Sequence, residues 1–312
     1  ADQHYFVTLE DGPNNFTIIA ANDGGIHYSA DRGQNWIELN SHFNVTQYYD
    51  ADKHPFQMQF IGGTQDNGTH RSPLDPDYSS AWPRVLGGDG FDCAWDKEND
   101  DVVYGTIYYT RVYRSTDGGN NFTQMANGLP QSSVFHTPLA MDPSNSSRLF
   151  TAGNDNSFFW TDNSGEQWND VFANYNNYTR MKIAVSESDP DIVWTGSTSL
   201  YTNVSTDGGL SFSQIPDMAG ETHAYLTGLH THPGQDSTAF LSLGVSGAGK
   251  VFRTRDLGQT WEDITNNLPD VPVHSVLVMP FDFNEIWLGT DIGLFISYNE
   301  GQTWEYADNG IP

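Results

Sequence analysis

The sequence predicts an all-β protein, a ring of seven four-stranded antiparallel sheets, which is the architecture of a seven-bladed β-propeller. Three observations lead to this prediction. An eight-residue motif recurs at intervals of 43 to 49 residues. Each interval contains four short stretches of strand composition, and no amphipathic helical stretch competes with them. A repeat of about 44 residues is the length expected of one propeller blade.

The repeated motif has Ser or Thr first, Asp or Asn third, Gly fifth and an aromatic residue eighth. The first interval, between Ser29 and Ser115, is 86 residues, or two periods. A degenerate copy is therefore expected at Ser72, with an expanded turn that leads to Trp82. Six clear copies and one degenerate copy make seven units. The clear copies begin at Ser29, Ser115, Thr161, Ser205, Thr254 and Ser297.

The chemistry of the motif indicates a structural role. Hydroxyl, carboxylate and amide side chains at the first and third positions can bind backbone groups of their own turn. Gly at the fifth position accepts a left-handed backbone, and the final aromatic residue packs between sheets. We therefore expect the third-position residues to hold turns together: Asp31, Asp117, Asn163, Asp207, Asp256 and Asn299.

Strands can be placed most clearly in the fourth and last units. In the fourth unit they are predicted over 134–141, 148–152, 157–161 and 167–172, and in the last over 274–279, 285–289, 294–297 and 303–306. The seven blades are expected to span 1–42, 43–87, 88–131, 132–176, 177–219, 220–270 and 271–312. Residues 309–312 match segments that lead into a new blade elsewhere. The chain is thus expected to be a fragment of a longer protein, although a ring closed by seven whole blades is also consistent.

Composition excludes several partners. Forty acidic and thirteen basic residues give a formal charge of −27, which repels nucleic acid and anionic membranes. No apolar stretch approaches the roughly 20 residues that span a bilayer. Cys93 is the only cysteine, so no internal disulfide forms, and its apolar neighbours predict a buried, inert thiol.

The face of the ring opposite the repeated motif is the expected site of function. The motif joins strands three and four of each blade. The turns between strands two and three, and the loops between blades, lie at the other end of the channel, here called the channel face. A rim of carboxylates, imidazoles and Tyr rings suits a polyhydroxylated ligand, but any polar propeller mouth has such a lining. The candidate ligand-binding residues are Tyr48, Asp66, Asp89, His136, Tyr178, His223, Tyr225 and His274.

The irregular second blade carries two further features. Glycine-rich segments place Asp66 and Asp89 on the channel face. In the expanded turn, Asp75 and Asp77 could hold a structural Ca²⁺ through their oxygens, although an ordinary Asp/Pro turn is favoured. No other cofactor is indicated, because the His residues lack a zinc-binding spacing such as His-Glu-x-x-His.

The repeats resemble the Asp-box, or BNR, motif over nearly the whole chain. The paired glycine-rich pattern around Asp66 and Asp89 resembles that of secreted bacterial BNR-repeat proteins, which implies a secreted or cell-surface location. Sortilin-type receptors share the repeat type, but they have ten blades and a Cys-rich extension that is missing here. Sialidases are disfavoured because no Arg-Ile-Pro motif occurs.

The chain also resembles the xyloglucan-cleaving glycoside hydrolases of family 74. That family pairs two seven-bladed Asp-box propellers, each with one catalytic Asp. Asp23 and Asp291 lie in turns similar to the family's Asp-Ile-Gly-Gly turn. Only one propeller is present here, so the resemblance accounts for one of the family's two catalytic carboxylates.

Two functions follow as alternatives. In the first, the chain is a secreted scaffold that recognises a glycan or another protein on its channel face, with further domains of the same chain as additional partners. In the second, it is a glycoside hydrolase domain, or half of one, in which Asp23, Asp66, Asp89 or Asp291 acts with an opposed carboxylate. An inverting pair requires carboxyl groups about 6.5–9.5 Å apart.

Overall fold

The structure is a computed structural model that describes residues 3–10, 16–22, 25–39, 46–77, 79–131, 134–153, 157–172, 181–197, 202–216, 225–247 and 249–307. These residues form seven four-stranded antiparallel sheets, and each sheet follows the chain order of its strands. No helix able to cross a membrane occurs among them. The predicted all-β fold of seven four-stranded blades is confirmed.

The strands of the first four sheets are β1 (Gln3–Glu10), β2 (Phe16–Asn22), β3 (Gly25–Ser29), β4 (Ile37–Glu38); β5 (Asp50–Lys53), β6 (Phe60–Thr64), β7 (Gly68–Arg71), β8 (Arg84–Leu86); β9 (Cys93–Trp95), β10 (Val103–Ile107), β11 (Arg111–Ser115), β12 (Thr123–Gln124); and β13 (Leu139–Asp142), β14 (Asn145–Ala152), β15 (Ser157–Thr161), β16 (Asn169–Phe172). The strands of the last three are β17 (Met181–Val185), β18 (Val193–Ser197), β19 (Thr202–Ser205), β20 (Ser213–Gln214); β21 (Leu226–His232), β22 (Gln235–Leu243), β23 (Val251–Thr254), β24 (Glu262–Asp263); and β25 (Val273–Met279), β26 (Asp282–Thr290), β27 (Gly293–Ser297), β28 (Glu305–Tyr306).

Strand positions agree with the sequence prediction apart from some ends. β15 has the predicted bounds, whereas β13 begins at Leu139 rather than at residue 134. Pro138 precedes Leu139 and has no N–H to donate to the ladder. Upstream of it, the Val134 carbonyl instead accepts a bond from the N–H of Tyr109. A proline therefore sets where the innermost strand of the fourth sheet begins.

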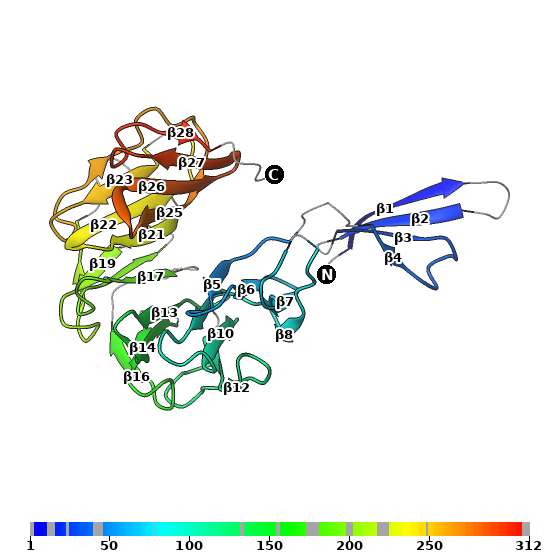
Figure 1. Ribbon diagram of the computed structural model, residues 1–312, viewed down its shortest axis with the longest axis horizontal. Helices are drawn as coiled ribbons and strands as arrows, with labels where there is room; N and C mark the ends of the chain where they lie inside the picture. Colours follow the sequence, from blue (N-terminus) through cyan, green and yellow to red (C-terminus); the bar gives the residue numbers. More distant parts are fainter. Residues whose placement is uncertain are drawn as a thin grey trace.

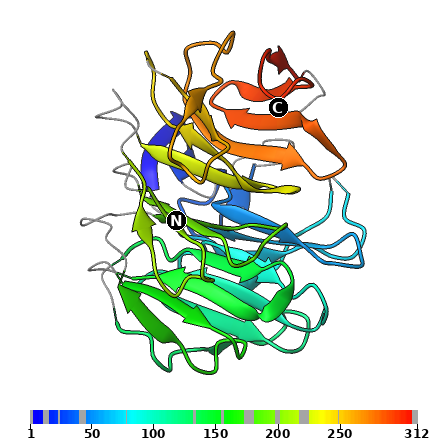
Figure 2. The same cartoon turned by 90° about the vertical axis from the view of Figure 1, so that its left-hand side faces the viewer.

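Six of the seven sheets pack face to face in an arc (Figures 1 and 2), and their innermost strands β5, β9, β13, β17, β21 and β25 contact one another in succession. A buried apolar cluster fills each of the five junctions along this arc. Large rings such as Trp168, Trp194 and Trp304 are almost fully enclosed in them. Burial of this aromatic area is the main force that holds the blades together.

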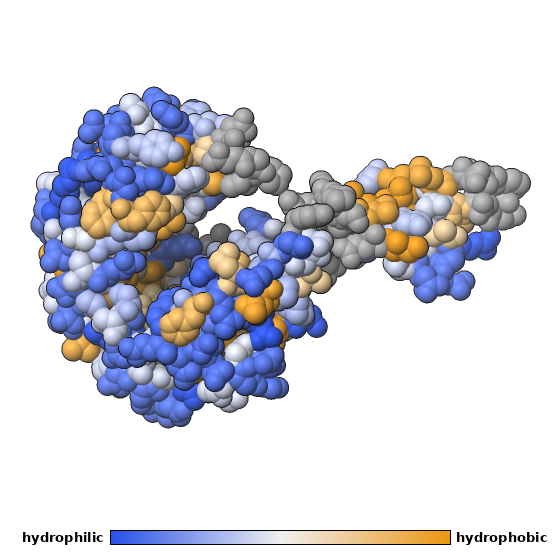
Figure 3. Space-filling view, in the orientation of Figure 1, coloured by the Kyte–Doolittle hydropathy of each residue, from blue (hydrophilic) through white to orange (hydrophobic). Residues whose placement is uncertain are grey.

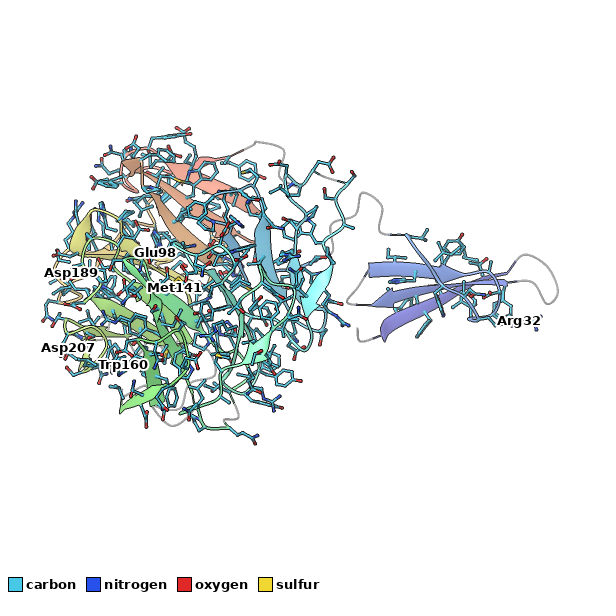
Figure 4. All side chains as sticks on the ribbon, turned by 60° about the horizontal axis from the view of Figure 1, so that its bottom comes forward. Arg32, Glu98, Met141, Trp160, Asp189 and Asp207 are labelled. Carbon is cyan, nitrogen blue, oxygen red and sulfur yellow. The ribbon has the colours of Figure 1, made fainter. Side chains whose placement is uncertain are left out.

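The first sheet, β1–β4, stands apart from this arc (Figure 1). None of the six apolar clusters found among the described residues includes a side chain from it. Arg32, at the tip of its β3–β4 turn, lies well away from Asp207, which occupies the matching turn of the fifth sheet (Figure 4). The first sheet thus has the fold of a blade without the packing of one.

The six clear boxes share one hydrogen-bond pattern, as the sequence predicts. In the third sheet, the Ser115 hydroxyl donates to Asp117 at 2.7 Å and accepts the N–H of Gly119 at 2.9 Å. Asp117 also accepts the N–H of Asn121 at 2.9 Å. The fifth-position glycines all have φ between +81° and +85°, a left-handed conformation that suits glycine. The box carboxylates therefore support their own turns.

A second pattern links consecutive blades. The residue directly before the box is Arg71, Arg114 or Arg253 in three sheets, and each guanidinium donates to the fourth-position carbonyl of the next sheet's box. The Arg114 bond, to Ser164, is 2.9 Å long. In the fourth sheet, Arg148 of β14 reaches the equivalent carbonyl instead. These bonds fasten the box face of the arc.

The second sheet lacks an intact box. The hydroxyl of Ser72 accepts the N–H of Phe60 at 2.9 Å instead of supporting a turn glycine. Trp82, at the end of the expanded turn, stacks on the Phe60 ring at 6.1 Å. The predicted degenerate copy thus keeps its hydroxyl and its aromatic residue. The hydroxyl binds the Phe60 N–H, and the aromatic ring packs on the Phe60 ring.

Candidate functional site

Carboxylates join the innermost strands of the second, third and fourth sheets. Alternate N–H groups of an innermost strand point away from its own sheet and need another acceptor. Asp side chains of the preceding blade supply it. Three such bonds occur: Cys93 N–H to Asp50 at 3.1 Å, Trp95 N–H to Asp52 at 2.7 Å, and Leu139 N–H to Asp92 at 3.0 Å. These carboxylates satisfy backbone N–H groups at the two junctions that join the second, third and fourth sheets.

Asp92 also binds His136. The Nε2–H of His136 donates to Asp92 Oδ1 at 2.8 Å, and the imidazole is only 2% exposed. Tyr49 stacks on this imidazole at 5.7 Å, and Phe91 meets it edge-on at 5.1 Å. The two aromatic rings and the carboxylate fix the His136 ring in a closed environment.

The pKa values of the neighbouring carboxyl groups of Asp50 and Asp92 are shifted in opposite directions. Burial, followed by the charge of Asp92, raises the pKa of Asp50 to about 7. Burial alone would also raise the pKa of Asp92. The charge and hydrogen bond of His136, with smaller contributions from Lys182 and the Leu139 N–H, outweigh that effect and lower it. Asp50 therefore changes charge near neutral pH beside a carboxylate that stays ionised.

Separated carboxyl pKa values are a feature of acid–base catalysts, but this pair is not placed for such chemistry. Both oxygens of Asp92 are occupied, one by His136 and the other by the Leu139 N–H. The neighbouring thiol of Cys93 is buried, as expected. Burial and the nearby Asp50 and Asp92 charges raise its pKa well above the usual range. A protonated, enclosed thiol is not a nucleophile, so the buried cluster holds strands together.

Exposed side chains lie in the channel-face turns and loops of the third, fourth, sixth and seventh sheets. We define the channel-face rim as six side chains, each at least one-third exposed: Tyr109, Phe135, Tyr225, His274, Asp291 and Ile292. His274 Nε2 donates to Asp291 at 2.5 Å, and both side chains are about half exposed. Arg111 lies over the rings of Tyr108 and Tyr109 at 5.7 Å. The rim offers aromatic faces and a solvent-accessible His–Asp pair.

The structure places the predicted ligand-binding residues in three environments. Tyr225 and His274 are on the rim, whereas His136 is buried. The Tyr48 ring covers Gly62 on a face of the second sheet and lies 5.9 Å from Trp82. Two further candidates, Tyr178 and His223, lie outside the described residues.

Of the four candidate catalytic carboxylates, three can be described, since Asp23 lies outside the described residues. Asp66 and Asp89 do come together, but the contact is a bond from the Asp66 backbone N–H to Asp89 Oδ1 at 2.8 Å. This bond supports the left-handed Asp66, whose φ is 64°. Asp291 is paired with His274. The Asp89 contact is therefore one that stabilises a turn.

The candidate Ca²⁺ turn is closed by its own side chains. Asp77 Oδ1 accepts bonds from the Ser79 N–H and from the hydroxyls of Ser79 and Ser80, between 2.8 and 3.1 Å. Hydrogen bonds from Ser79 lower the pKa of Asp77. In the part of the chain that is described, no three His, Cys, Asp or Glu side chains are grouped to hold a metal. The geometry fits the ordinary turn that the sequence favours.

Several residues of this region were not among the sequence candidates. Asp50 was missed because its importance comes from Cys93 and Asp92 of the next blade, more than forty residues away. Phe135 and Ile292 directly adjoin the candidates His136 and Asp291, so adjacency was a usable signal. Tyr109 could have been found from its place in a turn between strands two and three.

Comparisons with known proteins agree with the fold. The sequence model of the Sortilin-Vps10 family (sortilin, neurotensin receptor 3) matches residues 110–226. None of the curated proteins compared with the chain matches it. The match and the solved structures described next confirm the resemblance to Asp-box propellers of the sortilin and family 74 types.

Three solved structures illustrate the likeness. A GH74 enzyme from Niastella koreensis is 23% identical over 84% of this chain and 45% of its own, with a TM-score of 0.63. The GH74 xyloglucanase from Xanthomonas campestris is 16% identical over 85% and 45%, with a TM-score of 0.66. YCF48 bound to D1 peptide is 12% identical over 91% and 89%, with a TM-score of 0.59. The chain spans less than half the length of these GH74 enzymes, and the likeness at this identity shows the fold alone.

Proposed function

We propose that this chain is a recognition scaffold that binds a peptide segment or a glycan on its channel face. One observation carries the proposal: the rim exposes Tyr225, Phe135 and the His274–Asp291 pair, whereas the buried carboxylates Asp50 and Asp92 bind backbone N–H groups. Exposed aromatic rings supply contact area at low entropic cost. The His–Asp pair adds directional hydrogen bonds for a polar ligand.

The comparisons support both ligand classes without choosing between them. YCF48 has been solved with a D1 peptide bound, and the Xanthomonas protein is a xyloglucanase. A fold alone does not fix a function. The choice of a scaffold rests on the rim described above.

A glycoside hydrolase domain is the second candidate. It is supported by the resemblance of the Asp291 turn to the family 74 turn and by the structural likeness to GH74 enzymes. Against it, Asp89 supports the Asp66 turn. The proposal therefore treats Asp291 as a recognition residue and Asp89 as a turn residue, rather than as an acid–base pair.

Two assays on the same preparation test the proposal. Peptide and glycan arrays are probed with the labelled chain, and reducing-end release is measured from xyloglucan and other β-glucans. We expect array binding without reducing-end release. Release that disappears in Asp291→Asn or Asp89→Asn would show a hydrolase and contradict the scaffold.

We also propose that the protein works outside the cell or at its surface. The resemblance to secreted BNR-repeat proteins supports this location, and the formal net charge of −27 is compatible with it. Fractionation of the source cells, with detection by an antibody, should find the protein in the medium or on the surface. Recovery only from the cell interior would contradict this proposal.

A further inference from the structure

The second sheet departs from the repeat on the box face, the end of the ring that carries the Asp-box turns. Where the clear boxes have Asp or Asn at the third position, this sheet has Leu74, two residues after Ser72. The loop between β5 and β6 lies at the same end, because it joins strands one and two. The two segments meet, since the Asp75 N–H donates to the Met58 carbonyl at 2.7 Å. The degenerate unit therefore forms one surface from two loops.

Three apolar side chains are exposed on this surface. We define the box-face patch as Phe56, Met58 and Leu74, which are 65%, 52% and 55% exposed. The surface of the arc is mostly hydrophilic, and apolar residues form separate spots on it in the view of Figure 3. Neighbouring exposed apolar side chains mark an interaction surface. Loss of the box carboxylate at Leu74 thus coincides with a gain of exposed apolar surface.

The backbone of the patch is anchored although its side chains are exposed. The Phe56 N–H donates to His54 Nδ1 at 3.1 Å, and the His54 ring is buried against Trp95, with ring centroids 4.7 Å apart. On the other loop, Asp75 has a left-handed φ of 48°, which persists in a non-glycine residue only where the surroundings hold it. A surface that is fixed before binding loses little conformational entropy when a partner docks.

The charges beside the patch are mainly negative. The exposed carboxylates of Asp75 and Asp77 lie in the expanded turn, and hydrogen bonds from Ser79 lower the pKa of Asp77, which keeps it ionised. The ammonium of Lys53, in the other loop, donates to the His54 carbonyl at 3.3 Å. Apolar side chains next to ionised carboxylates are complementary to apolar side chains next to cations.

We propose that the box-face patch docks a segment of a partner protein in which apolar side chains lie beside Lys or Arg. The apolar side chains cover Phe56, Met58 and Leu74, and the cations face Asp75 and Asp77. A second copy of the chain is disfavoured as the occupant, because two molecules with formal charges of −27 repel each other. The patch belongs to the end of the ring opposite the channel face, so it is a second site, separate from the channel-face rim.

Fluorescence anisotropy with three labelled peptides tests the chemistry of the partner. The first is an amphipathic peptide of Leu and Lys, the second has Glu in place of every Lys, and the third has Ser in place of every Leu. We expect the unaltered chain to bind the Leu–Lys peptide best, and more weakly as NaCl is added, because salt screens the attraction between cations and carboxylates. Equal binding of either control peptide, or no binding of the Leu–Lys peptide, would overturn the proposal.

A matched pair of leucine variants locates the site. Leu74→Ser should weaken binding of the Leu–Lys peptide about tenfold, as loss of an apolar anchor does. Leu210→Ser is the control, because Leu210 is 52% exposed, close to the 55% of Leu74, and lies in the intact box turn of the fifth sheet. It should leave binding unchanged. Equal binding by the two variants would overturn the proposal.

Two aromatic variants separate this site from the channel-face rim. Phe56→Ser should weaken binding as Leu74→Ser does, and it decides the location if Leu74→Ser does not fold. Tyr225→Ala alters the rim and should leave binding of the Leu–Lys peptide unchanged. A loss in Tyr225→Ala with none in Phe56→Ser would place the peptide on the rim and overturn the proposal.

Discussion

At the scale of single residues, the channel of this propeller depends on carboxylates that act through the backbone. Asp50, Asp52 and Asp92 each accept an N–H from the innermost strand of the next blade. A buried N–H without an acceptor costs about 1–3 kcal/mol. The acidic composition thus includes side chains that hold the inner strands in register.

Asp50 gives a prediction about pH. Its pKa is raised to about 7 in the folded protein and is about 3.9 in an unfolded chain. Between these values the folded state holds a proton that the unfolded state has lost, so Asp50 lowers stability progressively as pH rises from about 4 to about 7. Asp50→Asn does not titrate and keeps an acceptor for the Cys93 N–H. Its stability relative to the unaltered protein should be greater at pH 8 than at pH 5 in urea unfolding. An equal difference at both pH values would contradict the account.

Asp92 gives a prediction about the buried cluster. Asp92→Ala leaves the enclosed His136 imidazole and the Leu139 N–H without their acceptor. Removal of one partner from a buried pair costs about 3–5 kcal/mol, and we expect a loss of this order in urea unfolding at pH 7. Asp101→Ala, at an exposed position in a loop of the same sheet, is the control. A loss no larger than that of the control would show that the cluster is not structural.

At the scale of elements, the Asp-box turn needs both its hydroxyl and its glycine. Gly119 has φ of +82°, and a Cβ there would approach Val103 to 3.2 Å. Gly119→Ala should therefore destabilise the protein by about 1–2 kcal/mol, since Ala at positive φ is strained. Gly87→Ala is the matched control, because no atom lies within 4 Å of its Cβ position and its φ is not positive. Equal stability of the two variants would contradict a structural role for the box.

These turns also show which features of the structure can be predicted from the sequence. The Ser115–Asp117–Gly119 pattern is local, so its geometry follows from the side chains within the turn. The start of β13 at Leu139 depends on where Pro138 falls in the ladder, which the repeat spacing does not show. The Asp50–Cys93 and Asp92–His136 contacts join different blades, and their partners are fixed only when the blades pack.

At the scale of the whole molecule, the two ends of the channel are built from different groups. Box turns and arginine–carbonyl bonds fasten one face, while the other carries the His274–Asp291 pair with the exposed rings of Tyr225 and Phe135. The sequence predicted this division from the place of the box between strands three and four. It did not show the separate position of the first sheet, because Tyr5, Phe6 and Leu9 have the pattern of an ordinary blade strand.

The measurement that tests this division most directly is a titration of the best array ligand against two tyrosine variants. Tyr225 lies on the channel-face rim and Tyr298 in the last box, with similar exposures of 63% and 59%. Loss of an exposed aromatic anchor costs about 1–2 kcal/mol or more of binding free energy. We predict that Tyr225→Ala weakens binding at least tenfold and that Tyr298→Ala leaves it unchanged. Loss of binding in Tyr298→Ala, with none in Tyr225→Ala, would place the site on the box face and contradict the account.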